Sequence, residues 1–200
     1  MQKPEVGSDS YFDDFSDSGS RWEVGSDDLA AWGYESEAYF IEIKQTQMIY
    51  WIIAPTQLEA TDLEFDAHPA ESYPDNLFGT YGAVCHYFDN DNFYIVEVDP
   101  STKAVYFGKY TQGNLVTLSD PEWIDANNFK PSSSDVNHIR VSCTGTGISL
   151  YLNGKFETEI SDDSAPSGGF VGFFAATYDG LPQGGFKVFF DNFSAWVPAQ

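Results

Sequence analysis

Positively charged residues are scarce in this sequence, which has 9 Lys and Arg against 31 Asp and Glu in 200 residues. The formal net charge of −22 produces a field that repels phosphate groups, so we expect no nucleic-acid partner. The same field suits cations, neutral ligands such as glycans, or simple solubility. A well-solvated acidic surface is the simpler explanation of the charge, so the charge excludes one class of partner without identifying another.

Long apolar runs are also missing. No stretch of eighteen or more apolar residues occurs, so we expect no part of this sequence to insert into a membrane. The opening MQKPEVGSDS has no apolar core of the kind that a secretory signal requires. The aromatic content of 17% and the low lysine content nevertheless favour an extracellular or cell-surface protein, with its signal outside the given sequence, over a cytosolic one.

Only two cysteines are present, Cys85 and Cys143, and their wide spacing fits neither a zinc site nor a redox pair. Each lies in a strand-like run, at a position that alternation assigns to the apolar face. If the two strands are neighbours, the cysteines can form a disulfide, worth about 2 to 4 kcal/mol in an oxidising compartment. The alternative is two buried free thiols.

Helical periodicity is almost absent, whereas short β-rich runs recur between turn signals, of which Asn153-Gly154 is the strongest. The sequence therefore predicts an all-β fold, a two-sheet antiparallel sandwich or jelly roll, as a single domain over residues 10–198. Residues 1–9 are expected to be a disordered tail. The predicted strands are 10–16, 20–24, 37–44, 47–54, 60–67, 79–88, 92–99, 103–110, 113–118, 136–144, 146–152, 154–160, 168–176 and 185–196.

The two ends of the predicted domain carry similar aromatic and acidic runs, YFDDFSD and VFFDNFSAW. Strands with this shared pattern can pair and bring the termini together. Residues 119–135 show no periodicity, and we predict a long loop there that carries Trp123 and Phe129.

Several of these segments together resemble the concanavalin A-like lectin/glucanase superfamily, over residues 11–197. The run ending in LYLNG, followed by GGFVGFFA and FDNF, is the most specific part of the resemblance. The nearest relatives that it suggests are laminin-G-like bacterial extracellular modules, akin to the domain family labelled 3-keto-disaccharide hydrolase. The resemblance implies a two-sheet jelly roll in a secreted or surface module, whose relatives include binders and hydrolases of carbohydrate.

The main site hypothesis concerns the strands around YGAVCHYFDNDNFYIVEV. If Tyr81, Cys85 and Tyr87 face the core, strict alternation places His86 on the opposite surface. On the next strand it assigns Tyr94, Val96 and Val98 to the core, and it assigns Phe93, Ile95 and Glu97 to the outer surface. By the same alternation Lys109 points outward with Val105 and Phe107. Sugars stack on rings and hydrogen-bond to charged groups, so such a surface suits a glycan. A structural network of cross-strand ion pairs is the alternative. The predicted ligand-binding residues of this surface are His86, Glu97, Lys109 and Arg140.

Trp123 is a further candidate, because it lies in the predicted polar loop beside Pro121. An exposed tryptophan in a loop can serve as a stacking platform for a sugar ring. The alternative is that Trp123 is one more aromatic residue of the core.

We expect no catalytic residues of the glucanase type. Glucanases of the superfamily carry an E-x-D-x-x-E strand, whose carboxylates act as nucleophile and acid. LEFDAHPAE offers Glu64 and Asp66, but Pro69 occupies the third position, so this strand is predicted to be a plain exposed face. The sequence contains no G-x-S-x-G nucleophile motif either.

Acidic residues at the two ends of the domain suggest a structural Ca²⁺ site. Calcium requires several oxygen ligands, and the sequence has no EF-hand loop. If the first and last strands pair, Asp14 and Asp191 approach each other, and the resemblance implies a structural Ca²⁺ near that seam. The acidic run DNDN is more simply a hairpin turn.

The leading interpretation is a non-catalytic module that binds carbohydrate or another cell-surface component. The chief alternative is a glycoside-processing hydrolase with an active site on a concave sheet face. A second alternative is a structural or adhesive domain with protein contacts along an exposed sheet edge.

Overall fold

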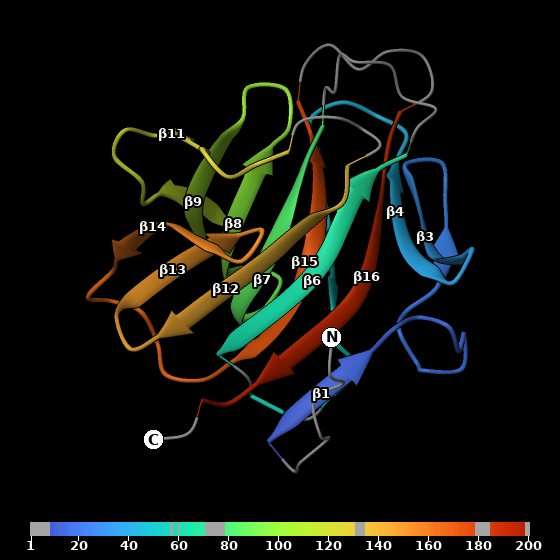
Figure 1. The fold of residues 1–200 in the computed structure, drawn as a ribbon, viewed down its shortest axis with the longest axis horizontal. Coiled ribbons are helices and arrows are strands. Elements are labelled where there is room, and N and C mark those ends of the chain that lie inside the picture. Colours follow the sequence, from blue (N-terminus) through green and yellow to red (C-terminus); the bar gives the residue numbers. More distant parts are fainter. Residues whose placement is uncertain are drawn as a thin grey trace.

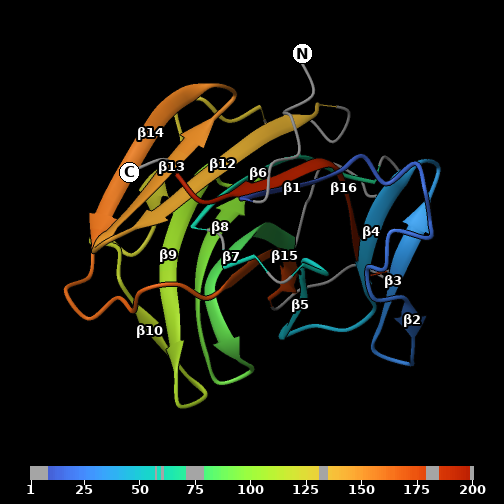
Figure 2. The same ribbon diagram turned by 90° about the horizontal axis from the view of Figure 1, so that it is seen from below.

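The computed structural model describes residues 9–56, 58–59, 61–70, 79–130, 135–178 and 185–198, and it confirms the predicted all-β sandwich. Two antiparallel sheets lie one over the other, and no described residue is helical (Figure 1). Figure 2 shows the two layers from below. The predicted tail lies outside the described residues except for Asp9, and the single domain over residues 10–198 stays a prediction.

The nine-stranded sheet has the order β14-β13-β12-β6-β16-β4-β3-β2, and β1 pairs with β16 off this path. Because β1 pairs with the last strand, the predicted contact between the two ends of the domain is confirmed. The strands of this sheet are β1 (Ser10–Asp13), β2 (Gly25–Ser26), β3 (Ala30–Glu35), β4 (Ala38–Ile43), β6 (Asp62–Pro69), β12 (Asn137–Thr144), β13 (Gly147–Leu152), β14 (Lys155–Ser161) and β16 (Phe186–Trp196).

The seven-stranded sheet has the order β10-β9-β8-β7-β15-β5, and the short β11 pairs with β9. Its strands are β5 (Met48–Ile53), β7 (Gly79–Asp89), β8 (Asn92–Asp99), β9 (Ala104–Thr111), β10 (Asn114–Thr117), β11 (Ile124–Asp125) and β15 (Phe170–Thr177).

The core lies between the inner faces of the two sheets. Two strands of the nine-stranded sheet, β4 and β13, alternate strictly between buried and half-exposed positions. The alternation points every second side chain inward, where aromatic rings from both sheets meet. Phe173 of β15 stacks on Phe190 of β16 with 4.1 Å between ring centroids. Each such fully buried side chain stabilises the fold by about 1.5 to 3 kcal/mol.

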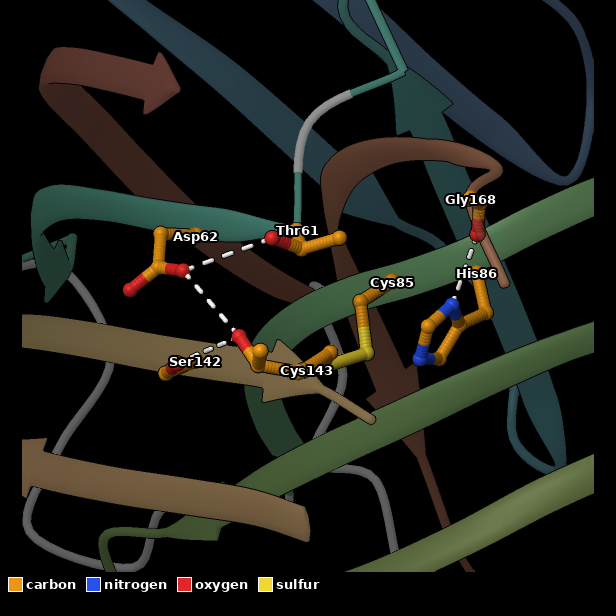
Figure 3. Close-up of a disulfide and its surroundings, with 8 residues drawn as sticks. Thr61, Asp62, Cys85, His86, Ser142, Cys143 and Gly168 are labelled. Carbon is orange, nitrogen blue, oxygen red and sulfur yellow. Dashed lines mark hydrogen bonds between the residues drawn. A yellow bond between two sulfur atoms is a disulfide. The ribbon is translucent and has the colours of Figure 1, made fainter. Parts of the chain in front are cut away.

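The structure contains a disulfide between Cys85 of β7 and Cys143 of β12. It joins the two sheets across the core, as Figure 3 shows. Of the two alternatives for the cysteines, the structure therefore has the disulfide.

The strand predictions fail mainly near the N-terminal end. The predicted strand 20–24 is absent, because Arg21 has a φ of 74°, which extended strands do not adopt. The observed β3 was not predicted, because its central Gly33 weakens the strand pattern, and pairing with β4 decides its conformation. The predicted loop 119–135 also contains β11.

Candidate functional site

The predicted surface of His86, Glu97, Lys109 and Arg140 does not exist as one face. Alternation in β7 ends at His86, whose φ of 47° lies in the left-handed region. Residues 86–88 form a bulge between Cys85 and Asp89, which keep their partners on β8. The bulge shifts the alternation of inward and outward side chains. Tyr87, which was predicted to lie in the core, therefore packs against aromatic and aliphatic side chains on the outer face of the seven-stranded sheet.

His86 is buried, with 3% of its surface exposed. Its Nδ1 lies 2.7 Å from the carbonyl oxygen of Gly168 (Figure 3), and burial lowers the pKa of the imidazole. Gly169 permits this contact, because a Cβ there would lie 2.8 Å from the Cα of His86. The prediction that His86 faces an open sheet surface is therefore wrong.

Lys109 and Arg140 both make ion pairs in the structure. The Lys109 Nζ lies 2.5 Å from Asp162, on the side of β9 that faces the core rather than the outer side predicted for it. Val105 and Phe107, predicted to point outward with Lys109, lie in the core between the sheets. Lys109 and His86 line one hollow, whereas Arg140 lies on the outer face of the other sheet.

The outer face of the seven-stranded sheet is rich in aromatic rings, and we call it the aromatic face. Phe93 stands between two neighbours, with ring centroids 4.8 Å from Trp51 and 4.5 Å from Tyr110. Alternation in β8 places Phe93, Ile95 and Glu97 together on this face, as predicted. Side chains that form or pack against the aromatic face are Ile49, Trp51, Ile53, Val84, Tyr87, Phe93, Ile95, Tyr106, Tyr110, Trp123, Phe174 and Ala176.

Glu97 is a carboxylate on the aromatic face, opposite Tyr106 of the neighbouring strand β9. Only 2% of its surface is exposed, and its Oε1 accepts hydrogen bonds from Thr80 and from the Tyr178 hydroxyl, the latter at 2.6 Å. Burial raises the pKa of Glu97, although these two donors favour the ionised form. Both bonds end on Oε1, so Oε2 has no hydrogen-bond partner among the described residues.

A hollow of about 350 Å³ lies beside Glu97. Its lining combines apolar side chains with two tyrosines, and Glu97 is the one charged residue among the described residues that line it. The hollow is lined by Gln47, Met48, Ile49, Ile95, Glu97, Tyr110, Leu115, Ala176, Thr177 and Tyr178.

A second carboxylate follows on the same side of β8. Asp99 lies two residues after Glu97, so alternation points both in the same direction. Its oxygens accept hydrogen bonds from the backbone and hydroxyl groups of Ser101 and Thr102 in the next turn. Asp99 therefore caps a turn, and Glu97 keeps the open oxygen.

Trp123 joins the aromatic face at one side. Its ring lies 5.3 Å from the ring of Tyr106, which pairs with Glu97 across β8 and β9. Trp123 is half-buried, so part of the ring stays open to a ligand. Of the predicted binding residues, Glu97 and Trp123 therefore share one face, and the use of Trp123 as a stacking platform stays a prediction.

Sequence reasoning missed Thr80, Tyr110 and Tyr178. The alternation of YFGKY could have placed Tyr106 and Tyr110 on one face. No local pattern indicates the contact between Tyr178 and Glu97, which are separated by 81 positions in the chain.

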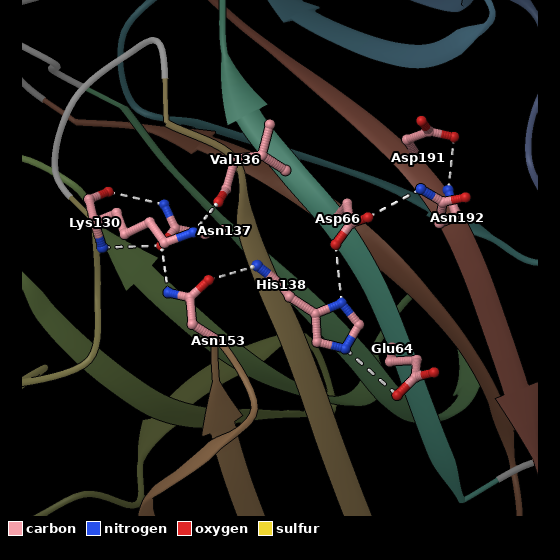
Figure 4. A network of polar contacts seen from close by, with 9 residues as sticks. All are labelled: Glu64, Asp66, Lys130, Val136, Asn137, His138, Asn153, Asp191 and Asn192. Carbon is pink, nitrogen blue, oxygen red and sulfur yellow. Dashed lines mark hydrogen bonds and ion pairs between the residues drawn. The ribbon is translucent and has the colours of Figure 1, made fainter. Parts of the chain in front are cut away.

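Glu64 and Asp66 lie on the outer face of the nine-stranded sheet, in the polar network of Figure 4. His138 Nδ1 lies 2.9 Å from Asp66, and its Nε2 lies 3.5 Å from Glu64. Hydrogen bonds to Asp66 and then to Glu64 raise the pKa of His138 to about 9. The two carboxylates are therefore bound to a histidine rather than poised as a catalytic pair.

Asp14 and Asp191 line one hollow of about 590 Å³ at the seam between the first and last strands. Burial raises the pKa of Asp191, and the nearby carboxylates of Asp66 and Asp14 add to the effect. Among the described residues, no group of three His, Cys, Asp or Glu is arranged to hold a metal. Hydroxyls of Ser16 and Ser36, backbone oxygens and water would have to complete a Ca²⁺ shell, so this site stays a prediction.

No family model and no curated protein matches the chain, so the nearer resemblance to the 3-keto-disaccharide hydrolase family stays a prediction. Solved structures do match. The carbohydrate-binding module CBM66 from Bacillus subtilis is 15% identical, with a TM-score of 0.63, over 87% of this chain and 94% of that one. A lichenase derived from a mouse hindgut metagenome is 13% identical, with a TM-score of 0.63, over 96% of this chain and 100% of that one.

A structure described as a native glycosidic hydrolase is 14% identical, with a TM-score of 0.65, over 96% of this chain and 99% of that one. The chain therefore shares the two-sheet jelly-roll fold of these structures, as the resemblance to the concanavalin A-like superfamily implied. This fold fits a carbohydrate-related function, and its occurrence in both binders and hydrolases leaves the choice to the site. Within the described residues, no helix is long and apolar enough to cross a membrane.

Proposed function

We propose that this chain is a non-catalytic carbohydrate-binding module of an extracellular or cell-surface protein, and that its aromatic face holds the glycan. One observation carries the proposal: rings from β5, β8 and β9 gather on a single sheet face, where Glu97 and Tyr110 line one hollow. Aromatic rings offer flat apolar surfaces to sugar rings, and a few polar groups fix their orientation. Trp51, Tyr110 and Trp123 are half-buried and keep accessible ring surface.

The carboxylates of this face support binding over cleavage. Glycoside hydrolysis ordinarily needs two carboxyl groups, one on each side of the scissile bond. Glu97 has an open oxygen, whereas the oxygens of Asp99 are held by the next turn.

A glycan array with purified protein tests the proposal. Tyr110→Ala should weaken binding to any glycan that the wild type retains, by about tenfold for one lost ring contact. Phe40→Ala is the matched control, because Phe40 lies on the outer face of the other sheet. Melting temperatures must show that both variants fold. If no glycan binds, or if both variants lose affinity equally, the proposal fails.

A glycoside hydrolase is the second candidate, because β8 points Glu97 and Asp99 in the same direction. Release of reducing sugar from a polysaccharide panel, lost in Glu97→Gln, would establish it. The third candidate is an adhesive domain, and the edge strand β10 favours it, because all four of its residues are exposed. Binding of a protein partner that survives Tyr110→Ala would support that function.

A further inference from the structure

We propose that the glycan held at the aromatic face carries a protonated amino group, and that this group binds to the open oxygen of Glu97. The inference rests on the proposed function and adds the chemical class of the ligand. Free amino sugars are the simplest glycans of that class.

The first step is the fixed orientation of the carboxylate. Thr80 and Tyr178 hold Oε1 from two directions, so the side chain of Glu97 has little freedom to rotate. Glu97 lines the hollow, and its Oε2 has no hydrogen-bond partner among the described residues. This oxygen is therefore available to a ligand. A ligand group that donates hydrogen bonds can pair with it.

The second step is the missing counter-charge. Among the described residues that line the hollow there is no Lys, Arg or His. An ionised carboxylate that is nearly fully buried is costly unless a cation pairs with it. A sugar hydroxyl supplies a hydrogen bond but no charge, whereas an ammonium group supplies both. Burial raises the pKa of Glu97, as expected for a carboxylate without a cation.

The third step is the chemistry of the walls. Tyr110 and Tyr178 contribute rings to the hollow, and the faces of such rings attract an ammonium group. Ile49, Ile95 and Leu115 offer apolar surface to the carbon skeleton of a sugar. The volume of about 350 Å³ is near the lower end for small-molecule sites, so it suits one or two sugar units.

The net charge of −22 attracts any cation to the whole protein. The experiment must therefore separate Glu97 from this general field. The matched control is Glu42→Gln, which removes the same charge from β4, in the other sheet.

The test compares two ligands of one length by titration calorimetry, near neutral pH and at physiological salt. The probes are the β-1,4-linked tetramer of N-acetylglucosamine and its fully de-N-acetylated form. We expect the amino form to bind at least about tenfold more tightly, because a charged hydrogen bond contributes about 1.5 to 3 kcal/mol. Glu97→Gln should remove this preference, and Glu42→Gln should leave it unchanged.

A second variant guards against a folding defect in Glu97→Gln. Tyr178→Phe keeps the ring and removes one donor to Oε1, so it should weaken binding of the amino tetramer severalfold and leave the acetylated tetramer unaffected. Equal binding of both tetramers, unaffected by Glu97→Gln, overturns this inference and leaves the proposed function intact. Equal losses of affinity for the amino tetramer in Glu97→Gln and Glu42→Gln also overturn it, because the general negative field of the protein would then explain the binding. If the protein binds neither tetramer and no glycan on the array, the proposed function fails as well.

Discussion

The outer face of the nine-stranded sheet carries paired charges, whereas the aromatic face of the seven-stranded sheet carries one buried carboxylate with an open oxygen. On the first face, Lys187 lies 2.8 Å from Glu35, with its Nζ 4.2 Å from the ring centroid of Phe40. Arg140 lies 3.4 Å from Asp62 and between the rings of two aromatic residues, Tyr151 and Trp196.

This contrast shows why counting charged residues on a strand does not locate a site. Lys187 and Arg140 of the nine-stranded sheet already have carboxylates and rings as partners, so most of their charge is balanced, although the Nε of Arg140 has no hydrogen-bond partner among the described residues. Glu97 has only neutral donors among the described residues, and it lines a hollow. The less charged face is therefore the better candidate for binding.

Loss of the disulfide should have the largest effect, and it tests whether stability and binding are separate properties. Cys85 and Cys143 are 58 positions apart. For the double variant Cys85→Ala/Cys143→Ala, the chain-entropy model therefore predicts a loss of about 4 kcal/mol in the free energy of unfolding. Both cysteines lie in the core, so glycan affinity of the folded variant should be unchanged. Urea unfolding measures the loss, and a change below about 1 kcal/mol would contradict it.

The network around His138 should make the nine-stranded sheet sensitive to alkaline pH. The folded pKa of about 9 lies above the usual 6.5, so the added stability is present below pH 6.5 and is lost as the pH rises through 9. Because the histidine is partly exposed, we expect the free energy of unfolding to fall by about 2 kcal/mol, which is less than the full pKa shift implies. Urea unfolding of the wild type and of His138→Gln over this range measures it, and equal slopes for the two proteins would exclude the network as the cause.

Glu97 should give a second pH effect, from the aromatic face. Its folded pKa is raised above 4.5, so wild-type stability is greatest below pH 4.5 and falls as the pH rises through the folded value. Glu97→Gln keeps an acceptor for Thr80 and Tyr178 and removes this fall. The variant should therefore have a higher melting temperature than the wild type at pH 8 but not at pH 4. An equal increase at both pH values would show that ionisation of Glu97 is not the cause.

Calcium should have the smallest effect, at the hollow that Asp14 and Asp191 line on the nine-stranded sheet. A cation between Asp14 and Asp191 would stabilise the folded state by mass action, so we expect the melting temperature to rise by a few degrees, on the order of 1 kcal/mol. Asp191→Asn should abolish the rise, and Asp163→Asn, which removes an exposed acidic charge in the loop after β14, should not. Identical melting with calcium and with chelator would remove this site from consideration.

The sequence predicted the structure best where neighbouring residues determine it. Asn153 and Gly154 have φ angles of 53° and 79°, as the expected hairpin turn requires. Alternation in β8 assigned Tyr94, Val96 and Val98 to the core, and the structure confirms it. The wrong assignments occurred in β7 and β9. A bulge at His86 reset the period in β7, and in β9 both faces are apolar, so alternation could not distinguish them.

Composition and period-two patterns were sufficient for the fold class, the turns and the acidic character, because each depends on residues close together in the chain. The surroundings of Glu97 depended on the folded arrangement. Thr80 and Tyr178 are 17 and 81 positions away from it. They reach its carboxylate only because the sheet pairs β7, which carries Thr80, with β8, and pairs β15, which precedes Tyr178, with the other side of β7. Hydrogen bonds over such separations form when strands pair, and no local pattern records them.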